Sequence, residues 1–246
     1  MRSLLLFLLI VLLGCNPKVS GKLDPKPKIG VDPTWAPQEF GAQNPYVNGF
    51  TDELLLEIAA VLEIEFNKLR ANPNDLLTGL NEGTYDAVLT SLPPFTYNLA
   101  KYDFSKTFLE TGPVFIVPKK ASYKKLSQVK NQYVGVIVGS KTGELIAKYP
   151  SILVRKYLSA PDLLNGIVNG EVAGGLLPRV PAAAYVPDLY QETLKIASPP
   201  LNTQGLHLVT LKNAHEELLQ DFDEAILVLK RKKKLDDLYK KWSLSL

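Results

Sequence analysis

The sequence predicts an α/β protein of two lobes joined by two extended crossings. Short apolar runs typical of buried strands alternate with helical patterns of apolar residues, and this alternation occurs in two blocks. Extended segments near Val114 and Asn202 connect the blocks. We therefore expect a discontinuous first lobe from residues 29–113 and 204–246, a second lobe from residues 114–203, and a ligand cleft between the lobes.

The first 28 residues are expected to lie outside both lobes. In the leader, residues 1–15, Arg2 precedes about ten apolar residues, which are too few to span a bilayer. This pattern is typical of a secretory signal peptide. Residues 16–28 hold three prolines and several lysines without apolar periodicity, as expected of a tether. The one cysteine of the chain, Cys15, ends the leader, so no internal disulfide can form.

Composition favours a folded protein and excludes several functions. The 246 residues are 46% hydrophobic and 22% charged, which suffices for one large core or two small ones. The formal charge of +3 is too small to attract a polyanion, so we expect no nucleic-acid partner. His207 and His215 fall on an expected strand and an expected helix start, and neither HExxH nor CxxC spacing occurs. We therefore expect neither an enzyme nor a bound metal or cofactor.

Two helices and a buried strand are predicted within the first lobe. Apolar residues at helical spacing predict a helix over residues 54–62. A second, shorter helix over residues 74–80 is expected to stop at Gly83. The apolar run at residues 85–89 predicts a buried strand, which ends in the Pro-Pro turn at residues 93–94.

The second lobe is predicted from four apolar runs and the helices between them. A short polar helix is expected over residues 123–132, and Ser159 is expected to cap a helix that ends at residues 169–170. The strands are expected over residues 114–117, 133–138, 152–158 and 171–178.

The chain is then expected to return to the first lobe. Residues 205–211 predict a strand, and Asn213 with Glu216 three residues later predicts a capping box at the start of a long helix. The basic run at residues 230–234 suits a solvated face at the end of this helix.

Dispersed motifs give the chain a resemblance to a known family. The strand YDAVL at residues 85–89, the turn DFS at residues 103–105 and the tail LDDLYKKW at residues 235–242 stand in the family's order. They resemble the extracellular solute-binding proteins of polar amino acid ABC importers, and the likeness covers roughly residues 29–242.

This resemblance implies a two-lobed, type 2 periplasmic-binding-protein fold with two hinge crossings. The lobes would close on a small polar solute, either an amino acid or an amino-acid-like compound. A membrane permease would read the closed form, and the protein would act as a monomer without cofactors. Two alternatives on the same fold stay open: a ligand-free sensor or interaction lipoprotein, and a binder of short peptides.

A second resemblance concerns Cys15. The residues Leu12-Leu13-Gly14-Cys15 resemble the bacterial lipobox, in which the leader is cut before the cysteine and the thiol carries diacylglycerol. The resemblance implies a protein lipid-anchored in the cell envelope and facing the periplasm or the exterior. The alternative is an unpaired thiol in a cleaved leader.

Two segments of the first lobe are implied to contact the ligand. In the family, the first pocket loop presents a carboxylate and an aromatic ring three places later, and Asp32 and Trp35 occupy these places. The alternative is a core tryptophan beside a turn-capping aspartate. Ser91 begins the loop in which relatives grip a carboxylate with arginine. Here Asn98 holds the arginine's place, and Pro93 replaces a ligand-bonding threonine.

The second lobe is implied to contribute a turn and a strand end. Ser140 and Thr142 keep the hydroxyls of the family's carboxylate-binding turn, and Lys141 adds a charge, although a solvated lysine is equally expected. Pro178 holds the place of the aspartate that receives the ligand's amino group, and Arg179 follows it. With the charged residues missing at Asn98 and Pro178, we expect a ligand other than an ordinary α-amino acid held in the ordinary way.

Overall fold

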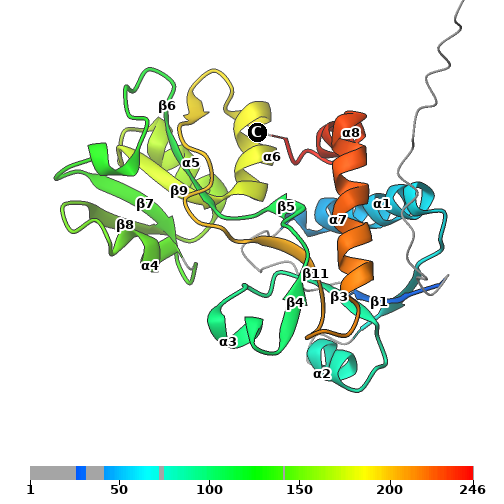
Figure 1. Cartoon of the computed structure of the whole chain (residues 1–246). Coiled ribbons are helices and arrows are strands. Elements are labelled where there is room, and N and C mark those ends of the chain that lie inside the picture. The colour runs from blue at the N-terminus through cyan, green and yellow to red at the C-terminus, as the bar shows by residue number, and fades with distance from the viewer. Residues whose placement is uncertain (1–25, 32–41, 72–74, 141, 246) are drawn as a thin grey trace, which may run out of the picture.

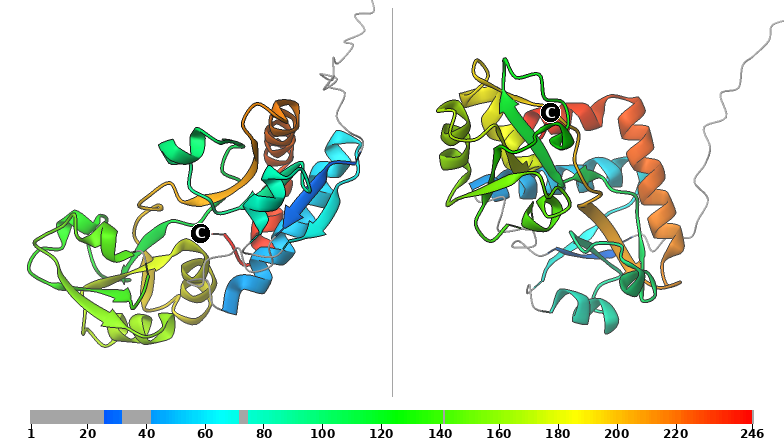
Figure 2. Two further views of the ribbon diagram at one scale, coloured as in Figure 1. Left: turned by 90° about the horizontal axis from the view of Figure 1, so that it is seen from below. Right: turned by 90° about the vertical axis from the view of Figure 1, so that its left-hand side faces the viewer.

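The computed structural model describes residues 26–31, 42–71, 75–140 and 142–245, which form two α/β lobes (Figure 1). Each lobe is built around its own mixed sheet, and two extended segments run between the sheets. The left view of Figure 2 shows the lobes next to each other with these segments between them. The expected fold class is confirmed.

The sheet of lobe 1 has the strand order β2-β1-β3-β11-β4, and β5 also pairs with β11. β1 runs parallel to β2 and β3, whereas β11 is antiparallel to β3, β4 and β5. The strands are β1 (Lys28–Val31), β2 (Asn67–Arg70), β3 (Ala87–Thr90), β4 (Tyr102–Phe104), β5 (Leu109–Glu110) and β11 (Gly205–Leu211).

Helices cover both faces of this sheet because side chains of successive strand residues point to opposite faces. Leu208 of β11 packs in the core beneath α1 and α7, and the next residue, Val209, packs with Leu76 and Leu80 of α2 on the other face. The helices of lobe 1 are α1 (Asn44–Leu62), α2 (Leu76–Asn81), α3 (Thr96–Leu99), α7 (Glu216–Arg231) and α8 (Lys234–Lys241).

The sheet of lobe 2 has the order β10-β6-β9-β7-β8. Residues of β6 alternate in the same way, with Val114 and Ile116 packed on one face and Phe115 and Val117 on the other. The elements are β6 (Pro113–Pro118), β7 (Tyr133–Ile137), α4 (Thr142–Ile146), β8 (Leu153–Tyr157), α5 (Ala160–Val168), β9 (Gly174–Pro178), α6 (Arg179–Leu189) and β10 (Leu194–Ile196).

Two crossings connect the lobes and pair with each other. The amide of Thr111 donates to the carbonyl of Gln204 at 2.9 Å, and the amide of Leu201 donates to the carbonyl of Pro113 at 2.8 Å. The crossings therefore lie side by side, and Gly112 of the first is packed directly against Asn202 of the second.

Three local expectations have different outcomes. The Ser159 cap is confirmed, because its hydroxyl accepts a hydrogen bond from the amide of Asp162 at 3.2 Å. The polar helix over residues 123–132 is reduced to one 3₁₀ turn, Leu126–Gln128. The capping box is wrong, because α7 is preceded by His215, which makes no side-chain cap. Within the residues that the structure describes, no helix combines the length and apolarity needed to cross a bilayer.

Candidate ligand site between the lobes

The loop after β3 forms the lobe 1 side of the candidate site. Ligands of open α/β sheets bind outside the carboxyl ends of strands, and Thr90 ends β3. Its hydroxyl accepts a hydrogen bond from the amide of Leu92 at 3.1 Å, which turns the chain immediately after Ser91. Ser91 is half-buried at this strand end, where the sequence places it as a ligand contact.

Asn98 closes the same loop from within. Its side chain is only 7% exposed, and its Nδ2 donates to the carbonyl of Pro93 at 2.8 Å. One amide hydrogen bond thus fixes the loop at Asn98, the position where the resemblance implies an arginine. The prediction that Asn98 contacts the ligand stays open, and the structure assigns its Nδ2 a loop-closing bond.

Two hydroxyls face each other at the start of α4 in lobe 2. The side chains of Ser140 and Thr142 share a hydrogen bond, and Thr142 is only 3% exposed. Gly139 allows the turn after β7 because its φ of +78° lies in the left-handed region, where side chains are strained. The structure thus brings together two of the three residues that the sequence predicts for this turn.

Arg179 lies at the junction of the lobes. As the first residue of α6 it follows Pro178, the buried end of β9, and its amide donates to the carbonyl of Gly112 at 3.1 Å. Its Nη1 donates to the carbonyl of Glu110 at 3.4 Å, and its guanidinium carbon Cζ lies 5.8 Å from the ring centre of Tyr239. Burial lowers the pKa of Arg179 from its usual value, although an arginine stays charged at neutral pH. Its contact with a ligand stays a prediction.

Four of the positions predicted from the sequence lie outside the described residues: Asp32, Trp35, Lys141 and the lipidation residue Cys15. Their roles are therefore predictions from the sequence. Ser91, Asn98, Ser140, Thr142 and Arg179 are the predicted ligand residues that the structure describes.

His207 is a buried residue near this edge that the motifs do not single out. It lies opposite Thr90 in the β3 and β11 pair and is 4% exposed. Its Nδ1 lies 3.1 Å from the carbonyl oxygen of Ser105, and Phe104 meets its ring edge-on at 5.7 Å. Burial lowers the pKa of His207, which favours a neutral imidazole. The signal in the sequence was a lone histidine within the apolar run of residues 205–211.

The part of the chain that the structure describes contains no candidate metal site. No three His, Cys, Asp or Glu side chains there lie close enough to hold a metal ion.

Comparisons with known proteins agree with this architecture. The family model of bacterial extracellular solute-binding proteins, family 3, matches residues 28–245. The L-cystine-binding protein TcyJ of Escherichia coli is 24% identical over 217 residues, which are 87% of this chain and 81% of that protein. The arginine-binding extracellular protein ArtP of Bacillus subtilis is 22% identical, over 94% of this chain and 92% of its own length.

Solved structures show the same fold. The L-cystine solute receptor of Neisseria gonorrhoeae, in its unliganded open conformation, superposes with a TM-score of 0.72. The two sequences are 19% identical, and the match covers 88% of this chain and 92% of the receptor. Substrate-binding domain 2 of Lactococcus lactis GlnP, also open, has a TM-score of 0.69 at 16% identity and covers 92% of this chain and 98% of the domain.

Proposed function

Because the chain belongs to family 3 of the bacterial extracellular solute-binding proteins, we propose that it binds a narrow set of amino-acid-like solutes for an ABC permease. The members of this family are substrate-binding proteins and not enzymes. The two-lobed fold suits the capture of a small polar solute by closure about the crossings. Its relatives include proteins that bind cystine, arginine and glutamine, so an amino-acid-like ligand is the coarse assignment.

One observation carries the narrower proposal. At the two positions where the resemblance implies charged residues, Asn98 bonds the carbonyl of Pro93 and Pro178 ends β9. Neither residue supplies a charge to a zwitterion. Leaving an ion unpaired in a closed cleft costs a binding free energy on the order of 2 to 5 kcal/mol. Common free amino acids should therefore bind weakly.

The remaining polar groups define the proposed contacts. The ligand's carboxylate lies toward the Ser140 and Thr142 hydroxyls, with Lys141 supplying the positive charge. Its cationic group lies toward Asp32 and Trp35, a carboxylate beside an aromatic face.

A thermal-shift screen tests this proposal. We expect most of the standard amino acids to raise the melting temperature little, and a smaller set to raise it clearly, with L-cystine and di- and tripeptides as the first probes. Asp32→Ala and Lys141→Ala should each abolish the response, because each removes a charge that the proposed ligand contacts require. Asn98→Ala should weaken it modestly through its loop, since a hydrogen bond contributes about 1 kcal/mol.

Matched controls make the screen decisive. Asp75→Ala in lobe 1 is the control for Asp32→Ala, and Lys148→Ala in lobe 2 is the control for Lys141→Ala. Each control removes an exposed charge of the same sign and should leave the response unchanged. Broad, tight binding of common amino acids would contradict the proposal, as would indifference to both charge removals at the site. A response to peptides alone would favour the peptide binder. An empty cleft in natively purified protein, with no response to any probe, would favour the sensor or interaction lipoprotein.

We further propose that Cys15 carries the lipid that anchors the protein. The family is extracellular, and the residues Leu12-Leu13-Gly14-Cys15 have the lipobox pattern. Cys15→Ser should move the protein from the membrane fraction to the soluble fraction, because several acyl chains provide most of the affinity for the bilayer. Fractionation with and without detergent measures this. Continued detergent-dependent extraction of the variant would refute lipid anchoring at this residue.

A further inference from the structure

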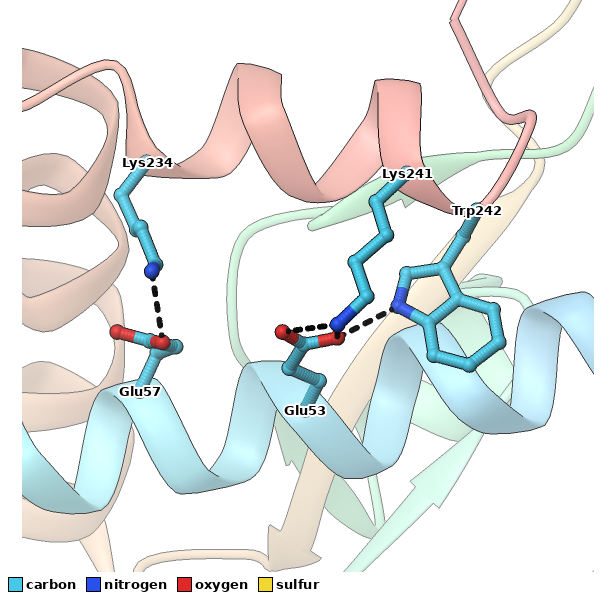
Figure 3. A network of polar contacts seen from close by, with 5 residues as sticks. All are labelled: Glu53, Glu57, Lys234, Lys241 and Trp242. Atoms are coloured by element: carbon cyan, nitrogen blue, oxygen red, sulfur yellow. Dashed lines mark hydrogen bonds and ion pairs between the residues drawn. The ribbon is translucent and has the colours of Figure 1, made fainter.

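Helix α8 is fixed to α1 by a network of polar contacts (Figure 3). Glu53 of α1 accepts hydrogen bonds from Lys241 Nζ at 2.8 Å and from Trp242 Nε1 at 2.9 Å. One helical turn further along α1, Glu57 pairs with Lys234 at 3.1 Å. The hydrogen bond from Lys241 is the main cause that lowers the pKa of Glu53, so this carboxylate is charged when the contacts form. The contacts hold both ends of α8 against α1.

Tyr239 is held on α8 between these two anchors. Its ring stacks on Phe50 of the core, with centroids 5.1 Å apart and planes 14° from parallel. Its hydroxyl donates to the carbonyl of Phe108. Burial raises the pKa of Tyr239 to about 12, so the hydroxyl keeps its proton at neutral pH. The ring is therefore a fixed part of lobe 1.

Arg179 of lobe 2 lies on this fixed ring. Its guanidinium is within the distance at which the face of an aromatic ring attracts a cation, and it also bonds the Glu110 carbonyl of lobe 1. Its own backbone is joined to lobe 2 through β9, whose last residue, Pro178, pairs with Pro113 beside the first crossing. Figure 1 shows α6 and α8 on the same side of the crossings. The Arg179 side chain thus links lobe 2 to lobe 1 next to the crossings.

We infer that Tyr239 is a positioning residue that holds Arg179 and so restrains the angle between the lobes. A guanidinium over a ring tolerates sliding better than a bidentate ion pair, so the contact can limit lobe rotation without preventing closure. The inference rests on the proposed hinge function, because the lobe angle matters only if closure captures the solute.

The restraint can be measured without any solute. Spin labels on exposed positions of the two lobes, introduced as Glu82→Cys and Lys120→Cys in a Cys15→Ser background, report the distribution of inter-lobe distances. Arg179→Met keeps an unbranched side chain but removes the cation. We expect it to broaden this distribution at least 1.5-fold in width, and we expect Tyr239→Leu to do the same.

Tyr239→Phe is the matched control because it keeps the ring face and loses only the hydroxyl. We expect it to lower the melting temperature while leaving the distance distribution unchanged. If Tyr239→Leu does not fold, Arg179→Met still decides the matter, since Arg179 is partly exposed. A distribution for Arg179→Met that superimposes on the parent's would overturn the inference. Equal broadening in Tyr239→Phe would also overturn it, by assigning the effect to lobe 1 stability. Failure to find a solute would affect only the proposed function.

Discussion

Replacing Trp242 by alanine should lower the free energy of unfolding of the protein by about 3 kcal/mol, the low end for removal of a large aromatic side chain. The low end applies because Trp242 is only half-buried. Its ring fills the space above Gly49, where an added Cβ would lie 2.2 Å from the ring, and its Nε1 donates to Glu53 at 2.9 Å. Urea denaturation followed by circular dichroism gives the value.

Two variants separate the parts of this loss. Trp242→Phe keeps most of the ring but loses the hydrogen bond to a charged carboxylate, which is worth about 1.5 to 3 kcal/mol, so a smaller loss is expected. Leu227→Ala truncates an exposed leucine of α7 and should change stability by less than about 0.5 kcal/mol. If Trp242→Ala is as stable as Leu227→Ala, the ring does not hold α8 to lobe 1.

Two strands buried on both faces, β6 and β11, were predicted to within one residue at each end. β6 and β11 have nearly continuous burial, and their apolar runs stand out from the surrounding chain. β2 has no such run, because Asn67–Arg70 alternates between half-buried and exposed positions at the sheet edge. It exists as a strand through its parallel pairing with β1, a partner that local pattern does not reveal.

The failed capping box shows how a distant group overrides a local motif. Asn213 and Glu216 have the right spacing, but the amide of Asn213 donates to the carboxylate of Asp103 at 2.8 Å. Asn213 adopts a φ of +58°, and α7 begins only at Glu216. The amide of this turn is thus bonded by Asp103 of β4, which is far from Asn213 in the sequence.

In the candidate site, too, a contact fixed by closeness in sequence could be predicted, whereas contacts that depend on the fold could not. Ser140 and Thr142 share a hydrogen bond, as expected because a two-residue separation at a turn nearly fixes their contact, and their binding of a ligand stays a prediction. The partners of Asn98 and Arg179 could not be foreseen, because they are a backbone carbonyl and the ring of Tyr239 in the last helix. Side-chain identity predicts what a residue can bond, whereas the fold decides which partner is within reach.

Gly112→Ala should disturb the hinge itself. A Cβ at Gly112 would lie 2.3 Å from Oδ1 and 2.8 Å from the backbone oxygen of Asn202, on the opposite crossing. The side-chain oxygen has little freedom to move, because it accepts the amide of Gln204 at 3.1 Å, and the backbone oxygen moves only with the crossing. The two crossings must therefore separate, at the cost of the bond from the Gly112 amide to the Gln204 carbonyl.

We expect Gly112→Ala to lose about 1 to 3 kcal/mol of stability, as overpacking does elsewhere, and to shift the mean inter-lobe distance measured with spin labels. Gly143→Ala is the control: it lies in α4 with open space where its Cβ would stand, so alanine should be neutral or stabilise by up to about 1 kcal/mol. An unchanged inter-lobe distance together with unchanged stability would show that the crossings can yield at this point, and that Gly112 does not set their spacing.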